Sequence, residues 1–294
     1  MNNSLKIGIV AGLIAGIFAS IILSIILVGF DLTGPQNPYA WSGLSLRFTS
    51  IIEIVIAEII LGVIWGILLG VIYSRFYDLI PGKKISKGLI FGLLYYSIYI
   101  IRTGMLILFY GWILFAFSFF LIGFLPWIVY GLAIGILYEF MSNRYHVIKD
   151  KRPIKTHPIM SGFFPGAIAG CIYGIMAFFG NLLMGILGIW AWIPNYLTDI
   201  VFLIDQLGTH VFFNLIWGGI FGMLFAFFYE RIPGRNISKS LIFSMVIFSI
   251  TSFRVGIYYL VYGSFPGFFA WVFFGFFAFI PYGLVLGYLY KPPK

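Results

Sequence analysis

Long apolar runs alternate with short polar segments along the whole chain. The runs are about 18 or more residues long, the length that a helix needs to cross a bilayer. The alternation over segments of about ten residues that marks a membrane barrel is absent. The pattern predicts an all-α integral membrane protein with eight transmembrane helices. We expect them at residues 7–30, 50–74, 87–109, 113–140, 161–187, 208–229, 239–261 and 266–290.

The charged residues lie mainly between the apolar runs. Only 9% of the residues are charged, against about 25% in a soluble domain. Of the 18 basic residues, 15 fall near the termini or in every second loop, which is the positive-inside pattern. We therefore expect a multi-pass protein of the plasma (cytoplasmic) membrane with both termini in the cytoplasm. Because this topology accounts for the net charge of +9, the charge does not indicate a nucleic-acid partner.

The chain contains an internal repeat. The segment 80–91 recurs 152 positions later as 232–243, with nine of twelve positions identical. The offset holds without a gap from the second predicted helix to the fourth, and the first helix aligns two positions further on. An even number of helices in each copy makes the copies parallel. We predict two four-helix repeats, residues 1–158 with a basic linker and 159–294, related by a pseudo-twofold axis along the membrane normal.

A tight turn precedes the third predicted helix of each copy. In the first copy Pro81-Gly82 predicts the turn and Ser86 the N-cap, and Ser238 holds the same place in the second copy. A capped hairpin explains these residues by itself. The alternative is an anion site at the helix start, for which anionic lipid head groups are the expected ligand. The basic residues that would form it are Lys83, Lys84, Lys87 and their counterparts in the second copy.

Small residues recur at every fourth position in all eight predicted helices, as Gly8, Gly12 and Gly16 do in the first. Residues with this spacing lie on one helix face and let two backbones approach closely. The spacing predicts a compact bundle with glycine-zipper contacts. It does not distinguish a transporter from a scaffold.

Six polar side chains stand within or at the outer ends of the apolar runs, where burying a charge is costly. The repeat pairs Glu53 with Asp205, Glu58 with His210, and Arg102 with Arg254. A rise of about 1.5 Å per residue places Glu58 and Arg102 each roughly 12 Å below the outer surface. The acids of the first pair lie nearer that surface. The expected helix start at 208 also puts His210 near the surface, whereas the repeat alignment puts it level with Glu58.

Three interpretations of this polar set stay open. Glu58 and Arg102 can form a structural ion pair that fixes helix register and lowers the cost of burying both charges. Alternatively, the two arginines line a polar cavity and donate hydrogen bonds to an anionic or polar ligand. In the third, the side chains extend to the outer surface. His210 can titrate near neutral pH, and Arg254 would then rely on Asp205, which leaves a proton-coupled step open.

Other chemistry has less support in the sequence. Metal-ligand spacing, a zinc-protease motif and a nucleophile elbow are all absent, and Cys171 reads as a packing residue. We expect no metal and no cofactor, and we lean against an enzyme, although an intramembrane enzyme acting on lipid is a further hypothesis. Glu139, near the inner end of the fourth predicted helix, reads as an interfacial residue.

These observations favour a small-solute or ion transporter or channel. Its polar site is expected between the repeats, in the outer half, near Glu58, Arg102, His210 and Arg254. The alternative is a non-catalytic accessory or assembly subunit of a larger membrane complex, with membrane-protein partners. The high aromatic content and the lack of a polar segment long enough for a soluble domain fit that alternative equally well.

Overall fold

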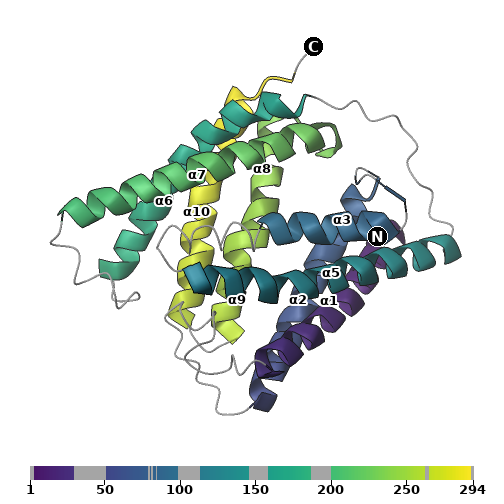
Figure 1. Cartoon of the computed structure of the whole chain (residues 1–294). Helices are drawn as coiled ribbons and strands as arrows, with labels where there is room; N and C mark the ends of the chain where they lie inside the picture. The colour runs from purple at the N-terminus through teal and green to yellow at the C-terminus, as the bar shows by residue number, and fades with distance from the viewer. Residues whose placement is uncertain are drawn as a thin grey trace. The chain divides into compact units, whose positions relative to one another are not determined.

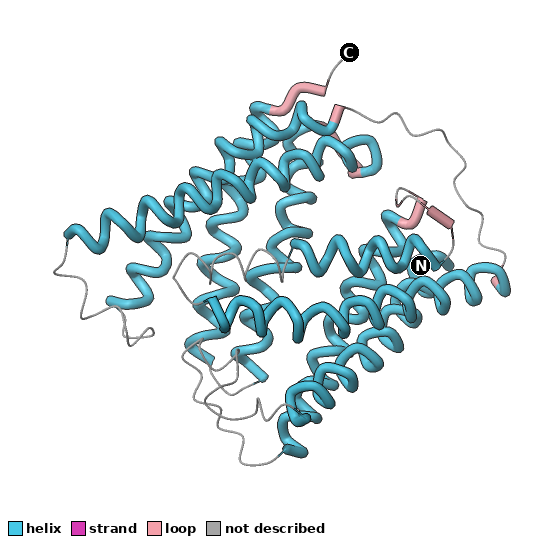
Figure 2. Tube along the Cα trace, viewed as in Figure 1, coloured by secondary structure: helices cyan, strands magenta, loops and turns pink. Residues whose placement is uncertain are grey.

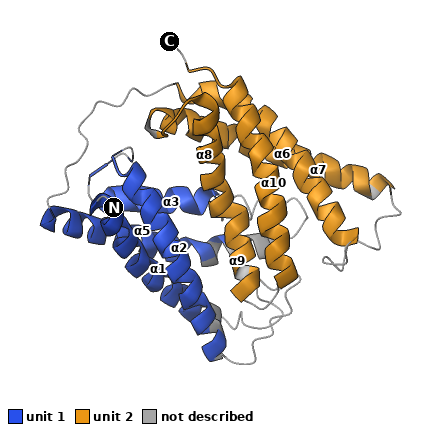
Figure 3. Cartoon of the chain, turned by 180° about the vertical axis from the view of Figure 1, so that it is seen from behind, with its two compact units in different colours: residues 1–152 blue, residues 153–294 orange. Residues whose placement is uncertain are grey.

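The structure is a computed structural model that describes residues 3–29, 51–78, 80, 82–83, 85–98, 113–145, 158–186, 200–261 and 265–292. The chain divides into two compact units, Met1–Arg152 (unit 1) and Pro153–Lys294 (unit 2) (Figure 3). The described residues form helices joined by turns, and no strand occurs among them (Figures 1 and 2). The predicted all-α class is confirmed.

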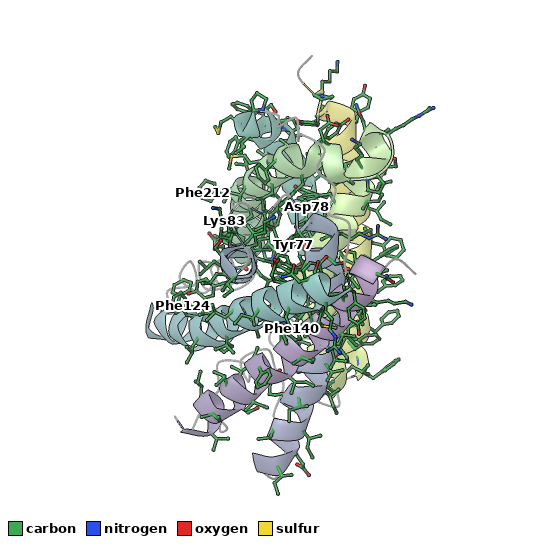
Figure 4. The ribbon with its side chains drawn as sticks, turned by 90° about the vertical axis from the view of Figure 1, so that its right-hand side faces the viewer. Tyr77, Asp78, Lys83, Phe124, Phe140 and Phe212 are labelled. Carbon is green, nitrogen blue, oxygen red and sulfur yellow. The ribbon has the colours of Figure 1, made fainter. Side chains whose placement is uncertain are left out.

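Unit 1 contains four labelled helices that pack as two pairs. They are α1 (Asn3–Gly29), α2 (Ile51–Phe76), α3 (Ile85–Tyr96) and α5 (Ile113–Arg144). Helix α1 packs along α2, α3 packs against α5, and the contact between α1 and α5 joins the pairs. Large apolar side chains stay exposed on the outside, as Phe124 and Phe140 do on α5 (Figure 4). Lipid contact is the environment that suits such a surface.

Unit 2 shows the same order of contacts. A short 3-10 turn, η3 (Ile159–Gly162), leads into α6 (Phe163–Ile186). Helix α6 packs along α7, and α10 packs against α8, α9 and α6. The remaining elements are α7 (Ile200–Phe228), η5 (Tyr229–Arg231), α8 (Asn236–Phe248), η6 (Ser249–Phe253), α9 (Arg254–Val261) and α10 (Phe265–Leu289).

Seven stretches of helix among the described residues are long and apolar enough to cross a membrane, with α8, η6 and α9 counted as one. Helix α3 is shorter, and the rest of the expected span 87–109 lies mainly outside the described residues. Polar backbone groups must be satisfied internally in lipid, which apolar helices of this length achieve. The chain is a polytopic membrane protein.

Two helix boundaries differ from those expected. Helix α7 begins at Ile200 and not at 208, because the polar residues before 208 continue the helix and the carboxylate of Asp205 stays exposed. The expected single helix 239–261 contains a π-helical segment, η6, between α8 and α9. Hydroxyl groups accompany it: Ser249 Oγ donates to the Met245 carbonyl at 2.8 Å. Such bonds to the preceding turn compete with regular helix geometry.

Glycines bring paired helices of each unit into backbone contact. A Cβ on Gly12 would overlap the Gly66 carbonyl across α1 and α2, and one on Gly166 would overlap the Gly218 carbonyl across α6 and α7. A Cβ on Gly131 would lie 2.7 Å from the Gly88 carbonyl oxygen. No larger residue fits without moving the helices apart. These contacts hold α1 against α2 and α6 against α7 at a fixed register.

The turn before α3 and the turn before α8 have the same geometry. Gly82 has a φ of 101° and Gly234 a φ of 104°, in the left-handed region that glycine adopts without a steric penalty. Ser238 is not the N-cap that we expected. Arg235 is the N-cap residue of α8, and Ser238 is the third residue of the helix. Ser238 Oγ accepts a hydrogen bond from the Arg235 backbone N–H at 2.8 Å. We call the end of each unit at which this turn lies the turn end, and the opposite end the far end.

Candidate functional site

Unit 1 contains three of the predicted site residues. Glu58 lies on α2 and is buried, with 4% of its surface exposed, whereas Glu53 is exposed near the start of α2. Arg102 lies outside the described residues, so its expected ion pair with Glu58 stays a prediction. The structure thus separates the two acids of α2 into one buried and one exposed group.

The surroundings of Glu58 follow from the register of α1 and α2. The helices run antiparallel, and Ser20 packs against Gly62. One turn farther along, Ser24 and Glu58 therefore share a level at the far end of unit 1. Ser24 Oγ is buried and has no hydrogen-bond partner among the described residues. A buried acid thus lies at the level of a buried hydroxyl that still has hydrogen-bonding capacity.

His210 is the centre of a polar network between α6 and α7 of unit 2. Its Nδ1 lies 2.8 Å from the Gln206 carbonyl oxygen. Because a carbonyl oxygen only accepts, Nδ1 carries the proton. Nε2 lies 3.1 Å from Asn181 Nδ2, so it accepts a hydrogen bond from the amide. Both partners fit the neutral imidazole, and protonation of Nε2 would require Asn181 to turn its oxygen toward the ring.

Neighbouring residues fix His210 in this position. Asn214 Nδ2 donates to the His210 carbonyl at 2.8 Å, and the Phe178 ring lies edge-on with its centroid 6.0 Å from that of the imidazole. A Cβ on Gly174 would lie 2.7 Å from the same carbonyl oxygen, so glycine is needed for the close approach of α6. Sequence reasoning missed Asn181. Its signal is an amide within an apolar run.

Arg254 is the first residue of α9 and follows η6 directly. Within η6, Thr251 and Ser252 are buried, and Thr251 Oγ1 donates to the Ile247 carbonyl at 2.8 Å. Unit 1 also turns π-helical at Ser97, the residue 152 positions before Ser249. Single π turns occur often at functional sites. The segment before Arg254 therefore has a π-helical backbone that we did not predict from the sequence.

Asp205 and Arg254 lie on helices with different packing partners. Asp205 is exposed on α7, whose main partner is α6, and Arg254 is half-buried on α9, which packs against α10. The expected ion pair between these residues stays a prediction. For His210 the structure describes hydrogen-bond partners on both ring nitrogens, and for Glu58 it describes burial.

Glu139 lies near the end of the fourth expected helix, where we expected an interfacial residue. The side chain is buried at the turn end of unit 1, with 8% of its surface exposed. Tyr77, which directly follows α2 (Figure 4), donates its hydroxyl proton to Glu139 Oε2 at 2.5 Å. Burial and then this hydrogen bond raise the pKa of Tyr77. Sequence spacing missed the contact because Tyr77 and Glu139 are far apart in the chain.

Two further contacts complete this turn-end cluster, which we define as Ser4, Tyr73, Tyr77, Tyr138 and Glu139. Tyr138 and Ser4 share a hydrogen bond of 2.8 Å between their hydroxyl oxygens. The Lys87 ammonium donates to the Tyr77 carbonyl at 2.8 Å and lies 4.2 Å from the centre of the Tyr77 ring. A cation and a carboxylate thus contact the same tyrosine.

No family model, curated protein or solved structure matched this chain. Among the described residues, no group of three or more His, Cys, Asp or Glu side chains is placed to hold a metal ion. The class of the protein, a polytopic helical membrane protein, therefore rests on the length and apolar character of its helices.

Proposed function

We propose that the protein is a small-solute or ion transporter whose transport is coupled to proton movement. The observation that carries this proposal is the pair Glu58 and His210. Each is an ionisable side chain inside an apolar helix, and the two lie 152 positions apart in the sequence. Glu58 is buried, and His210 bonds to Asn181 of the preceding helix. Ionisable residues inside membrane helices are expensive to bury and mark ion or proton pathways.

The chain is a tandem duplication in this proposal, with two parallel four-helix repeats. The matching turns at Gly82 and Gly234 and the matching contact order of the helices support it. Basic residues gather at the turn ends, which therefore face the cytoplasm together with both termini. Lys83 and Arg235 are exposed there and attract anionic lipid head groups. Glu58 and His210 then lie in the outer half of the membrane.

The transported solute is a small anionic or polar molecule. Arg102 and Arg254 supply planar guanidinium groups that bind carboxylate or phosphate oxygens with two hydrogen bonds. The π-helical segment directly before Arg254 supports this role, because single π turns occur often at functional sites. A proton on Glu58 or His210 offsets the charge of the bound anion during transport.

The experiment uses proteoliposomes that contain the purified full-length protein and an internal pH dye. Valinomycin and a potassium gradient set the membrane potential, and phosphate, succinate or glutamate is added outside. The wild-type protein is expected to give a proton flux that depends on one of these anions. Glu58→Gln and His210→Gln should abolish this flux, and Asp205→Asn, an exposed matched control, should retain it. An anion-dependent flux that survives both Glu58→Gln and His210→Gln would refute the proposal.

A second candidate function is an accessory subunit of a larger membrane complex. The exposed aromatic residues of α10 favour it, since Phe269, Phe273 and Phe277 contact one another along one face with ring centroids 5.0 and 4.6 Å apart. Such a surface suits a partner helix as well as lipid. Stoichiometric co-purification of a membrane protein, lost in Phe273→Ala and Phe277→Ala, would support this function. An anion-dependent flux that is measured without any such partner, and that is lost in Glu58→Gln and His210→Gln, would exclude this function.

A further inference from the structure

Two tyrosine hydroxyls in the core of unit 1 have no hydrogen-bond partner among the described residues. They belong to Tyr73, which has no exposed surface, and to Tyr130, which is 1% exposed. A buried hydroxyl without a partner is unfavourable, and few such groups occur in native proteins. An internal water molecule with two to four polar neighbours is the usual way to satisfy such groups. Each of the two hydroxyls therefore has hydrogen-bonding capacity for an internal water molecule.

The neighbours of these hydroxyls are polar. The Tyr73 ring centroid lies 5.5 Å from that of Tyr77 and 5.3 Å from that of Tyr138. The Tyr77 hydroxyl in turn bonds to Glu139, so the Tyr73 ring, the Tyr77 hydroxyl and the Glu139 carboxylate lie in succession toward the turn end.

Unit 2 shows that helix packing does not require this arrangement. The positions 152 residues after Tyr73, Tyr95 and Glu139 hold Phe225, Ile247 and Lys291. Tyr282, the counterpart of Tyr130, donates its hydroxyl proton to the Gly218 carbonyl at 3.3 Å. The same helix arrangement is therefore stable with an apolar residue in place of Tyr73. Unit 2 therefore lacks the hydroxyls of Tyr73 and Tyr95 and the carboxylate of Glu139 at the matching positions.

Glu139 is the proton acceptor in this chain. Its 2.5 Å bond from Tyr77 has the length of a hydrogen bond from a hydroxyl to a charged carboxylate. Ser4 on α1 is half-buried and bonds to Tyr138, so the cluster reaches the surface at the turn end. The titratable and charged groups around Glu139 and Tyr77 are Tyr73 on α2, Asp78 after α2, Lys87 on α3 and Tyr138 on α5.

We propose that the inner core of unit 1 is a binding site for a proton and for water, with Glu139 as the acceptor and Tyr73, Tyr130 and Tyr138 as the hydroxyls that hold the water. A hydronium ion at the turn end gives one proton to the Glu139 carboxylate and leaves as water. The carboxyl group becomes neutral, and Tyr77 keeps its own proton. The site goes beyond the proposed transport, since proton binding at Glu139 does not depend on movement of a solute.

Infrared difference spectroscopy on the full-length protein in lipid nanodiscs, between neutral and acidic pH, tests the site. The wild-type protein should show the band of a protonated carboxyl group, which shifts in D₂O, and a band of weakly bonded internal water. Glu139→Gln should lose the carboxyl band, whereas Glu53→Gln, which changes an exposed acid, should keep it. A carboxyl band that persists unchanged in Glu139→Gln overturns the assignment of Glu139.

Two tyrosine variants keep the test informative if Glu139→Gln does not fold. Tyr73→Phe copies the residue that unit 2 carries as Phe225, and it should lose the water band and keep the carboxyl band. Tyr77→Phe should move the carboxyl band to higher frequency, because the carboxyl group loses a hydrogen bond. If neither variant alters these bands, the water and proton site is refuted. Bands that behave as expected without anion-dependent flux leave this site standing and refute only the transport.

Discussion

Tyr77 in unit 1 and Tyr229 in unit 2, 152 positions apart, give their hydroxyl protons to different acceptors. The backbone carbonyl of each tyrosine accepts a hydrogen bond from a lysine ammonium. Lys87 donates to Tyr77 at 2.8 Å, and Lys239 donates to Tyr229 at 2.9 Å. The Tyr77 hydroxyl then donates to the Glu139 carboxylate, and the Tyr229 hydroxyl to the Asn236 amide oxygen. A carboxylate can take up a proton and an amide cannot. One scaffold therefore holds an ionisable centre in unit 1 and a neutral one in unit 2.

The far ends also differ in their polar side chains. Glu58 of unit 1 is buried at the level of Ser24, whereas His210 of unit 2 sits in a network with Asn181 and the Gln206 carbonyl. The positions that hold the helices together are nearly alike in the two units, and the polar side chains between them have diverged. The shared backbone contacts therefore determine the fold, and the polar side chains that differ between the units determine the chemistry.

The largest expected effect falls on a feature that the units share. Gly12→Leu and Gly166→Leu each place a side chain where a carbonyl of the partner helix lies. Each substitution should reduce the free energy of unfolding by about 3 kcal/mol or more, or prevent folding. Thermal unfolding in detergent, followed by size-exclusion chromatography, measures the loss. Similar losses of stability are expected in both units. If Gly166→Leu were tolerated, the α6–α7 contact would not be equivalent to the α1–α2 contact.

The next effect separates the two tyrosines. Tyr77→Phe leaves a buried carboxylate without its donor and should cost about 1.5–3 kcal/mol. Tyr229→Phe removes a bond to a neutral amide and should cost about 0.5–1.5 kcal/mol. The denaturation midpoints of the two variants, measured side by side, check the difference. Equal losses would mean that Glu139 carries no charge in the folded protein.

Exchanging the residues at a single repeat position gives an asymmetric result. Phe225→Tyr should cost about 1–3 kcal/mol, because it adds a hydroxyl to a side chain with no exposed surface, in a unit that carries Lys291 where unit 1 carries Glu139. Tyr73→Phe should change stability by less than about 1 kcal/mol, since its hydroxyl has no hydrogen-bond partner among the described residues. Thermal unfolding curves of both variants decide the matter. A Phe225→Tyr protein as stable as the wild type would contradict the difference assigned to this position in the two units.

The smallest expected effect is a loss of stability at high pH. Burial, followed by the Glu139 hydrogen bond, raises the pKa of Tyr77 in the folded protein, and burial also raises that of Tyr229. The folded state therefore favours the neutral phenol, and this contribution is complete below the ordinary tyrosine pKa of about 10. It is lost as the pH rises above that value. Unfolding measured from about pH 9 upward should show a shallower decline in Tyr77→Phe than in the wild type.

The apolar pattern was enough to predict the helical class and most of the spans, because lipid demands long helices whose side chains are apolar. Helix α10 (Phe265–Leu289) lies within one residue of the expected span 266–290. The start of α7 was placed too late because polar residues such as Asp205 resemble a loop, although they extend a helix whose end is exposed. The π turn before Arg254 follows from local hydroxyl bonds that periodicity does not contain.

The candidate site was less accessible to sequence reasoning. Glu58 and His210 stood out as ionisable groups in apolar runs, and the structure describes Glu58 as buried and His210 as bonded to Asn181. Glu139 did not stand out, because a charge at a helix end is ordinary and its counterpart Lys291 pointed to the membrane surface. Its importance comes from a partner 62 positions away, the hydroxyl of Tyr77, and only the fold brings the two together.

Proton uptake by the purified protein tests the contrast between the units most directly. A pH-indicating dye in weakly buffered solution counts the protons bound as the pH is lowered from neutral. The wild-type protein should bind one proton per molecule more than Glu139→Gln, and Lys291→Gln, which alters the matching position of unit 2, should bind as many as the wild type. Equal uptake by the wild type and Glu139→Gln would contradict a proton-binding centre in unit 1.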